Sequence, residues 1–369
     1  MTDVLRRGGG DLAFDDHPLL AIWEVTQACD LACAHCRACA QADRDPRELT
    51  TDEGKALLAR LGEMKVPLLV LTGGDPAKRP DLVELIEAGT RAGLTVAVTP
   101  SGTPVLQRDQ LARMRDAGLA RLAISVDGPD AASHDAFRGV EGSFAETKRI
   151  LDDAREFGIP VQINTSVGSH NIKSVRAMAD FVREVSAVLW GVFLVVPVGR
   201  AGSSLLLGPK RVETLLEELA QIAKEYPFDV KTTAAPHFRR VLMHDRNRKA
   251  MVGVLEDVDA EGVVKGPRGI TDGVGFLFVS HVGDVFPSGF LPMSAGNVRE
   301  EDVGAIYRES PLFTRLRDYD SLGGKCGVCP FRRVCGGSRA RAYAATGDVM
   351  AADPLCAYEP KGWNESSAS

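Results

Sequence analysis

The first 200 residues of the chain repeat one pattern six times: a short apolar run, a polar turn and a stretch with helical periodicity. The strands predicted from this pattern are Leu19–Thr26, Leu68–Thr72, Thr95–Thr99, Arg121–Val126, Val161–Ser166 and Gly191–Pro197. The helices predicted between them are Thr51–Met64, Pro80–Ala92, Arg108–Ala117, Phe144–Phe157 and Ser174–Val185. Such alternation requires parallel strands with helices outside them. It predicts an α/β fold with a parallel sheet, for which a doubly wound open sheet is one possible arrangement.

Glycines follow three of the predicted helices. Gly93, Gly118 and Gly158 each stand one residue beyond the end of a periodic stretch. A residue with a left-handed backbone commonly ends a helix at this position, and glycine adopts that backbone without steric cost. The three glycines therefore support the predicted helix boundaries.

Three cysteines follow the first predicted strand. Cys29, Cys33 and Cys36 have the spacing CxxxCxxC. Three thiolates can hold three corners of a cubane iron–sulfur cluster and leave the fourth iron open to a small molecule, as catalytic metal sites do. A structural zinc loop is the alternative interpretation. Cys39 could be mistaken for a fourth ligand, but it would close the open position, so we predict that it is a neighbouring thiol and not a ligand.

Composition narrows the class of protein. A chain of 369 residues with 44% hydrophobic residues is long and apolar enough for about two domains with real cores. Its N-terminus lacks the apolar stretch of a secretory signal, and no apolar run approaches the roughly 20 residues of a membrane span. We therefore expect a cytoplasmic protein without a membrane partner. A net charge of −6 argues against nucleic acid as a partner.

The eight cysteines form two groups that resemble ligand sets. In a cytoplasmic chain this grouping favours metal or redox chemistry over disulfides. The second group consists of Cys326, Cys329, Cys335 and Cys356, which could close a cluster completely or hold zinc. Spacing alone does not choose between the two metals.

The CxxxCxxC loop after a first strand resembles the radical S-adenosylmethionine (radical SAM) superfamily. The resemblance favours a partial (β/α)6 TIM-type barrel, with chemistry at the C-terminal ends of the strands. It implies that Cys29, Cys33 and Cys36 are the catalytic ligands of a 4Fe-4S cluster that binds SAM. It also implies reductive cleavage of SAM to a 5′-deoxyadenosyl radical, which abstracts hydrogen from the substrate. A reductant such as ferredoxin or flavodoxin would supply the electron.

The resemblance also assigns contacts to SAM. The run Thr72-Gly73-Gly74-Asp75-Pro76 is similar to the family's Gly-Gly-Glu motif, which receives the methionyl amine. Asp75 stands where Glu is commoner, so this contact could rest on backbone carbonyls. The other implied contacts with the ribose, carboxylate or adenine of SAM are His35, Ser101, Ser125, Asp127, Asn164 and Val196. Turn capping, a core amide and loop packing are the alternative roles for these side chains.

With the N-terminal motif, the second cysteine group resembles a shortened SPASM (twitch-type) region. The resemblance implies one fully ligated auxiliary 4Fe-4S cluster, because full SPASM regions carry two and no cysteine lies between Cys39 and Cys326. The predicted domains are a tail over 1–17, the barrel over 18–200, a helical connector over 201–262, the SPASM/twitch-like region over 263–360 and a tail over 361–369. Within the connector we expect a helix at Lys210–Glu225, and within the SPASM/twitch-like region we expect a hairpin at Gly275–Phe286.

The overall arrangement resembles radical SAM enzymes of haem d1 and alternative haem biosynthesis, which alter tetrapyrrole side chains, and those of the tunicamycin type. It predicts a biosynthetic oxidoreductase acting on a small-molecule, tetrapyrrole or natural-product substrate. A peptide-modifying radical SAM/SPASM maturase is an alternative, although only 28 residues precede Cys29, too few for a leader-binding domain. A zinc-stabilised binding or scaffold protein is an alternative of a different class.

A propionate-bearing tetrapyrrole would require cationic anchors near the barrel mouth. The candidates are Arg37, Arg200, Arg268, Arg339 and Arg341. Ordinary surface or ion-pair arginines are the alternative interpretation for each of them.

Overall fold

The structure, a computed structural model, describes residues 14–244, 263–264, 268–361 and 363. Within these residues, ten strands form one sheet in the order β10-β9-β8-β1-β2-β3-β4-β5-β6-β7. The first seven strands are β1 (Leu20–Glu24), β2 (Leu68–Thr72), β3 (Thr95–Val98), β4 (Arg121–Ser125), β5 (Val161–Val167), β6 (Leu189–Leu194) and β7 (Asp229–Thr233). They are parallel and lie side by side in chain order.

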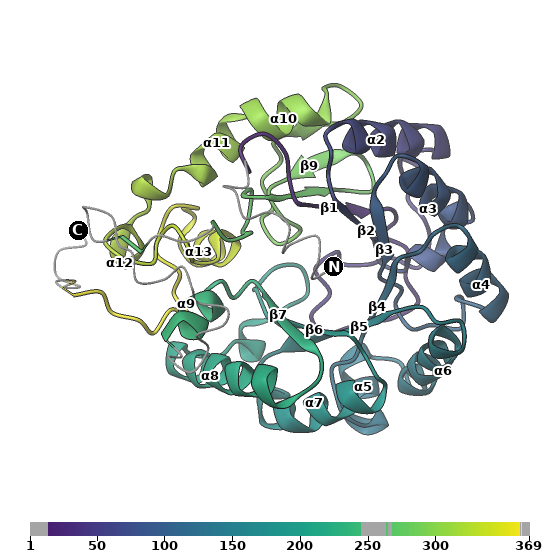
Figure 1. The fold of residues 1–369 in the computed structure, drawn as a ribbon, viewed down its shortest axis with the longest axis horizontal. Helices are drawn as coiled ribbons and strands as arrows, with labels where there is room; N and C mark the ends of the chain where they lie inside the picture. Colours follow the sequence, from purple (N-terminus) through teal and green to yellow (C-terminus); the bar gives the residue numbers. More distant parts are fainter. Residues whose placement is uncertain (1–13, 245–262, 265–267, 362, 364–369) are drawn as a thin grey trace.

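The helices that accompany these strands form an outer arc around the curved sheet (Figure 1). They are α2 (Thr51–Glu63), α3 (Leu82–Arg91), α4 (Arg108–Asp116), α5 (Ala131–Arg138), α6 (Ser143–Glu156), α7 (Val175–Glu184), α8 (Pro209–Glu225) and α9 (His237–His244). A doubly wound sheet reverses its strand order at a switch point within the βαβ units, whereas β1 to β7 follow one another across the sheet in chain order. Successive right-handed crossovers in one direction place the helices on one face. The fold is therefore the predicted barrel-like α/β fold, with a sheet that is not closed.

Local sequence accounts for the ends of these elements. Thr50 caps α2, since its hydroxyl accepts from the backbone N–H of Glu53 and the Glu53 carboxylate accepts from the Thr50 N–H. Gly93, Gly118 and Gly158 follow α3, α4 and α6 with φ values of +84°, +99° and +67°. The prediction from the three glycines is confirmed.

The C-terminal region extends the same sheet at its other edge. Strand β8 (Phe276–Val279) pairs in parallel with β1, and β9 (Asp284–Phe286) and β10 (Gly296–Asn297) follow in antiparallel pairing. The predicted hairpin is thus confirmed. The helices of this region are α10 (Val303–Glu309), α11 (Pro311–Arg317), α12 (Gly324–Gly327) and α13 (Arg339–Thr346). They lie at the open side of the helical arc, as Figure 1 shows.

Three elements, α5, β7 and α9, were not expected from the sequence. Helix α5 precedes α6; Asp130 caps its N-terminus and Gly139, with φ +71°, ends it. The predicted connector over 201–262 contains the expected helix α8, but it also contains β7, which pairs with β6. The sequence of β7, Asp-Val-Lys-Thr-Thr, has no apolar run, and β7 is the last strand at one edge of the sheet. The remainder of the predicted connector, residues 245–262, lies outside the described residues.

The main core lies between the helices and the convex face of the sheet. Trp23 and Trp190 are fully buried in it, together with leucines of α2 and α3. Gly54 of α2 allows this packing, since a Cβ there would lie 2.5 Å from the Trp23 ring. No helix in the described part of the chain is long and apolar enough to cross a membrane.

Candidate functional site

The concave face of the sheet encloses a cavity of about 580 Å³. Barrel interiors are usually filled by bulky branched side chains. Here Ala97 and Ala123 occupy inward positions in the middle of β3 and β4. Their small side chains leave the interior open from the N-terminal to the C-terminal ends of the strands. A cavity of this size is typical of small-molecule sites.

The cysteine triad lies at the wall of this cavity, in the loop that follows β1. Helix α5 holds this loop, because the N–H groups of Ala32 and Ala34 donate to the carbonyl oxygens of Arg138 and Phe137, both at 3.1 Å. The helix that was missed in the sequence therefore positions the triad.

Each sulfur of the triad has a nearby hydrogen-bond donor. The N–H of Leu31 donates to Cys29 Sγ at 3.4 Å, Arg138 Nη1 donates to Cys33 Sγ at 3.6 Å, and the N–H of Ala40 donates to Cys36 Sγ at 3.4 Å. Donors directed at sulfur stabilise thiolates, which are the form that ligates metal. Burial raises the pKa of the Cys29 thiol, which favours the protonated form. A metal that binds the sulfur would displace this proton and stabilise the thiolate.

Cys39 lies outside this arrangement. It is exposed, has φ +49° and does not line the cavity. Within the described residues, no three Cys, His, Asp or Glu side chains are close enough to hold a single metal ion. In a 4Fe-4S cluster, by contrast, each thiolate binds a different iron. The three cavity-lining thiols and their donors fit such a group.

Gly73 and Gly74 bring the end of β2 against the cysteine loop. A Cβ on Gly74 would lie 2.5 Å from the carbonyl oxygens of Gln27 and Ala28, and one on Gly73 would lie 2.5 Å from that of Thr26. Both glycines line the cavity. They are required by the close approach of two backbones.

The Asp75 carboxylate is directed away from the cavity. It accepts from Thr103 Oγ1 at 2.6 Å, from the N–H of Ala77 at 3.1 Å and from the N–H of Ser101 at 3.4 Å. The side chain is fully buried, and burial raises its pKa. The Asp75 side chain therefore does not line the cavity, and the expectation that contacts with SAM here rest on the backbone stays a prediction.

Of the other residues assigned to SAM, most lie at the cavity. They are His35, Ser101, Ser125, Asn164 and Val196. Asp127 differs, since its carboxylate is buried behind the wall, 2.6 Å from Arg138 Nη2, and accepts from the N–H of Ser166 at 2.6 Å. The Asp127 carboxylate therefore stabilises the wall of the cavity and does not face the cavity, as a direct contact with a ribose would require.

The imidazole of His35 stacks on the ring of Phe137, with centroids 4.5 Å apart. Phe137 in turn stacks on His170 at 3.9 Å. Burial lowers the pKa of His35 to about 4, so the imidazole is neutral near pH 7. The stack fixes a flat neutral ring beside Cys36. Neither Phe137 nor His170 was identified in the sequence, because both lie between the predicted motifs.

The arginines proposed as anchors are scattered. Among the five, only Arg37 lines the cavity, where its guanidinium pairs with Glu24 and lies 4.7 Å from the Phe278 ring centroid. Arg200 is exposed, and its backbone N–H donates to the carbonyl of Cys36.

The remaining three anchor candidates lie away from the cavity. Arg268 is exposed and pairs with Asp15, whereas Arg339 and Arg341 are buried in the C-terminal region. The expectation of cavity anchors is wrong for these three, since their guanidiniums serve contacts within the protein.

The cavity is nevertheless cationic. Among the described residues that line it, five have a positively charged side chain and one has a negatively charged one. The cations are Arg37, Arg121, Arg138, Lys231 and Arg239, and the acid is Asp272. The Asp272 carboxylate accepts from the N–H groups of Arg339 and Ala340 at the start of α13. An acidic chain that builds a cationic interior favours an anionic ligand.

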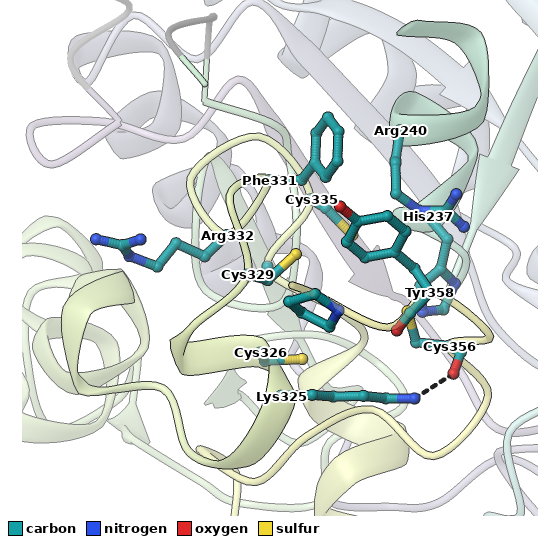
Figure 2. A pocket seen from close by; sticks show the side chains of 13 residues that line it. His237, Arg240, Lys325, Cys326, Cys329, Phe331, Arg332, Cys335, Cys356 and Tyr358 are labelled. Atoms are coloured by element: carbon teal, nitrogen blue, oxygen red, sulfur yellow. Dashed lines mark hydrogen bonds between the residues drawn. The ribbon is translucent and has the colours of Figure 1, made fainter. Parts of the chain in front are cut away.

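The second cysteine group surrounds a separate small cavity. Figure 2 shows Cys326, Cys329, Cys335 and Cys356 around it, with Lys325 donating to the carbonyl oxygen of Cys356 at 2.5 Å. All four are free thiols. Burial raises the pKa of Cys329 to about 11 and that of Cys335 further, so these groups favour the thiolate only when a metal binds.

A buried carboxylate fixes the loops of this second group. Asp353 accepts from the N–H of Ser338 at 2.7 Å and lies 3.1 Å from His237 Nε2 and 3.2 Å from Arg341 Nη1. Its backbone carbonyl accepts from the N–H of Cys356 at 3.2 Å. His237 had no visible partner in the sequence, because Asp353 lies more than 100 residues away.

Comparisons with known proteins agree with this geometry. A family model described as the radical SAM superfamily matches residues 23–182. The AdoMet-dependent heme synthase of Methanosarcina barkeri is 39% identical over 349 residues, which span 95% of this chain and 99% of that enzyme. The Fe-coproporphyrin III synthase of the same organism is 28% identical over 383 residues, spanning 96% of this chain and 94% of that protein.

Among solved structures, Streptococcus suis SuiB bound to S-adenosylmethionine aligns with a TM-score of 0.71. The alignment covers 93% of this chain and 78% of SuiB at 16% identity. At that level of identity the likeness establishes the fold.

Proposed function

Because the chain belongs to the radical SAM superfamily, we propose that it cleaves SAM reductively and converts propionate side chains of an iron tetrapyrrole to vinyl groups, forming haem. The relative at 39% identity is named for haem synthesis. The observation that carries the proposal is the single cavity that joins the cysteine triad to a cationic, partly aromatic interior. The alternative of a zinc-stabilised scaffold is wrong, because the superfamily and the named relatives are enzymes.

Cys29, Cys33 and Cys36 would hold the SAM-binding cluster, and their sulfur-directed donors fit that role. A cluster with bound SAM supplies an electron that yields a 5′-deoxyadenosyl radical able to remove hydrogen from a C–H bond. Gly73 and Gly74 would let the backbone approach the methionyl group, and the neutral His35 ring would present a flat surface to the adenine. Ser101, Ser125 and Asn164 offer hydrogen bonds to the remaining polar groups.

The substrate assignment rests on the shape and charge of the interior. Phe193, Phe276 and Phe278 line the cavity with flat apolar surface, and its cations outnumber its single acid. Coproporphyrin has an apolar macrocycle with propionates, and haem carries vinyl groups where coproporphyrin carries some of these propionates. Converting a propionate to a vinyl group releases carbon dioxide, one hydrogen atom and one electron. Enclosure of the reacting side chain excludes water from this conversion.

Cys326, Cys329, Cys335 and Cys356 would hold one auxiliary 4Fe-4S cluster without an open iron. They line one cavity as free thiols, with the cationic side chains of Lys325 and Arg240 beside them. Cationic groups near a cluster offset its negative charge. Such a cluster supplies one-electron transfer, which suits a conversion that releases an electron. An external reductant such as ferredoxin or flavodoxin would act as a further partner.

The test is an anaerobic assay of the reconstituted full-length protein with SAM, dithionite and iron coproporphyrin III. We expect 5′-deoxyadenosine and haem, measured by liquid chromatography, and about eight irons per chain if both clusters form. Cys29→Ala should abolish SAM cleavage, whereas Cys335→Ala should retain part of it. Haem formation by Cys29→Ala, or SAM cleavage by the wild type without any change in the tetrapyrrole, would refute the proposal.

A further inference from the structure

Two cations of the cavity lack a carboxylate partner among the described residues. Arg37 and Arg138 pair with Glu24 and Asp127, and Asp229 acts on Arg121. No ion pair to Lys231 or Arg239 is found in the part of the chain that the structure describes. Both side chains line the cavity, Lys231 on β7 and Arg239 on α9.

An unpaired cation away from bulk water is costly unless a ligand or partner compensates it. Burial lowers the pKa of Lys231, and the positive charges of Arg239 and Arg121 act in the same direction. The pKa falls to about 8, so the ammonium form still predominates near pH 7. A bound carboxylate would offset these positive charges and stabilise the ammonium form.

The guanidinium of Arg239 is held in place by the protein. Its Nη2 donates to the carbonyl of Ile270 at 2.8 Å and its Nη1 to that of Val334 at 3.3 Å. Gly269 provides the space, because a Cβ there would lie 1.4 Å from Arg239 Nη1. These two bonds use part of the five N–H donors of an arginine and fix the plane of the group. The remaining donors are pre-organised for an acceptor.

We propose that Lys231 and Arg239 form the subsite that binds a carboxylate of the tetrapyrrole substrate inside the barrel. This inference rests on the proposed function and names the residues that select a carboxylate-bearing substrate. Lys231 and Arg239 take the anchoring role that the sequence had suggested for Arg268, Arg339 and Arg341, which do not line the cavity. The apolar wall formed by Phe276 and Phe278 would contact the macrocycle while the two cations bind its acidic edge.

The test is a binding titration of the anaerobic, cluster-loaded protein with iron coproporphyrin III, followed by the shift of the Soret absorption band. The probe is compared with its methyl ester, which keeps the macrocycle but lacks the negative charges. Lys231→Met and Arg239→Met should each weaken binding of the free acid by about tenfold to a hundredfold, the range for one charge-assisted hydrogen bond. Lys231→Arg should recover most of the affinity, because it restores the charge.

Arg113→Met is the matched control, because it removes one positive charge from the exposed face of α4, outside the cavity. It should bind the free acid as the wild type does. The methyl ester should bind weakly and with the same affinity to the wild type and to Lys231→Met. Iron content and the unfolding midpoint verify that each variant is folded.

The outcomes separate the two proposals. If the wild type binds the free acid and the Lys231→Met/Arg239→Met double variant binds it equally well, the carboxylate subsite is refuted and the proposed function stands. If the wild type binds neither the free acid nor its ester, the proposed function fails and the subsite fails with it. Weakened binding of the free acid alone, recovered by Lys231→Arg, supports the subsite.

Discussion

The carboxylate of Asp127 lies 2.6 Å from the guanidinium of Arg138, whose other terminal nitrogen donates to the sulfur of Cys33. Both side chains are buried. A residue assigned to SAM from the sequence thus acts on the sulfur of Cys33 through an arginine. The ion pair connects the end of β4, the end of α5 and the cysteine loop.

Asp127→Asn should therefore destabilise the protein and lower its cluster content. Removing one partner leaves the Arg138 charge buried and unpaired, which typically costs about 3–5 kcal/mol. The measurements are the free energy of unfolding and the iron content after reconstitution. The Asp127→Asn/Arg138→Met double variant should be more stable than Asp127→Asn, because it removes the unpaired charge. Equal stability of Asp127→Asn and wild type would contradict this account.

Stability should also depend on pH through His134. Burial lowers the pKa of this imidazole to about 4, and the nearby Arg138 acts in the same direction. Between that value and the ordinary value of 6.5 the unfolded chain binds the proton and the folded chain does not, so stability falls as pH falls through this window. The contribution is roughly 1–3 kcal/mol.

The measurement is the unfolding midpoint at about pH 7.5 and about pH 5.5. His134→Asn keeps an acceptor for the N–H of Asp127, which lies 3.4 Å from His134 Nδ1, but it cannot titrate. The drop in midpoint should therefore be smaller in this variant. His17→Asn, at a partly exposed position outside the core, is the control and should retain the wild-type dependence. An undiminished drop in His134→Asn would assign the pH dependence to other groups.

Gly74→Ala should impair cluster assembly more than it impairs folding. The new Cβ would lie 2.5 Å from the carbonyl oxygens of Gln27 and Ala28, so the loop that carries Cys29 must shift. We expect a loss of about half of the bound iron, since the second cysteine group lines a different cavity, which Gly74 does not line. Gly208→Ala is a matched control, because no atom lies within 4 Å of its Cβ position and its φ is −83°. A full iron content in Gly74→Ala would show that the loop tolerates the shift.

Periodic sequence predicted the repeated part of the fold well. The apolar run Leu68–Thr72 matches β2 residue for residue, because a buried parallel strand is visible as an apolar segment. Strand β7 and helix α5 were missed for the opposite reason. Strand β7 presents the polar side chains Lys231, Thr232 and Thr233 to the cavity, and α5 buries one apolar side chain, Phe137, beside His134 and Arg138.

The candidate site was predictable only where its residues are local in sequence. Cys29, Cys33 and Cys36 are close together in the sequence, and all three line the cavity, while their role as cluster ligands stays a prediction. The donor to Cys33 comes from Arg138, 105 residues away, and no local pattern indicates it. The cavity cations were missed for the same reason: a strand lysine is recognised as inward-facing only after the register of β6 and β7 is known.

Asp353→Asn should remove the proposed auxiliary cluster while sparing the proposed SAM-binding cluster. This carboxylate is fully buried, and the positive charge of Arg341 and its contact with His237 hold its pKa well below the usual range against the effect of burial. Its loss leaves Arg341 unpaired and releases the loop before Cys356, at a cost of about 3–5 kcal/mol. Iron should fall from about eight to about four per chain, and SAM cleavage without tetrapyrrole should persist. Asp348→Asn, in an exposed pair with Arg315, should lose less than about 1 kcal/mol and no iron. If Asp353→Asn kept both clusters, the loop would be fixed by the backbone alone; if it lost both, the two cysteine groups would fold as one unit.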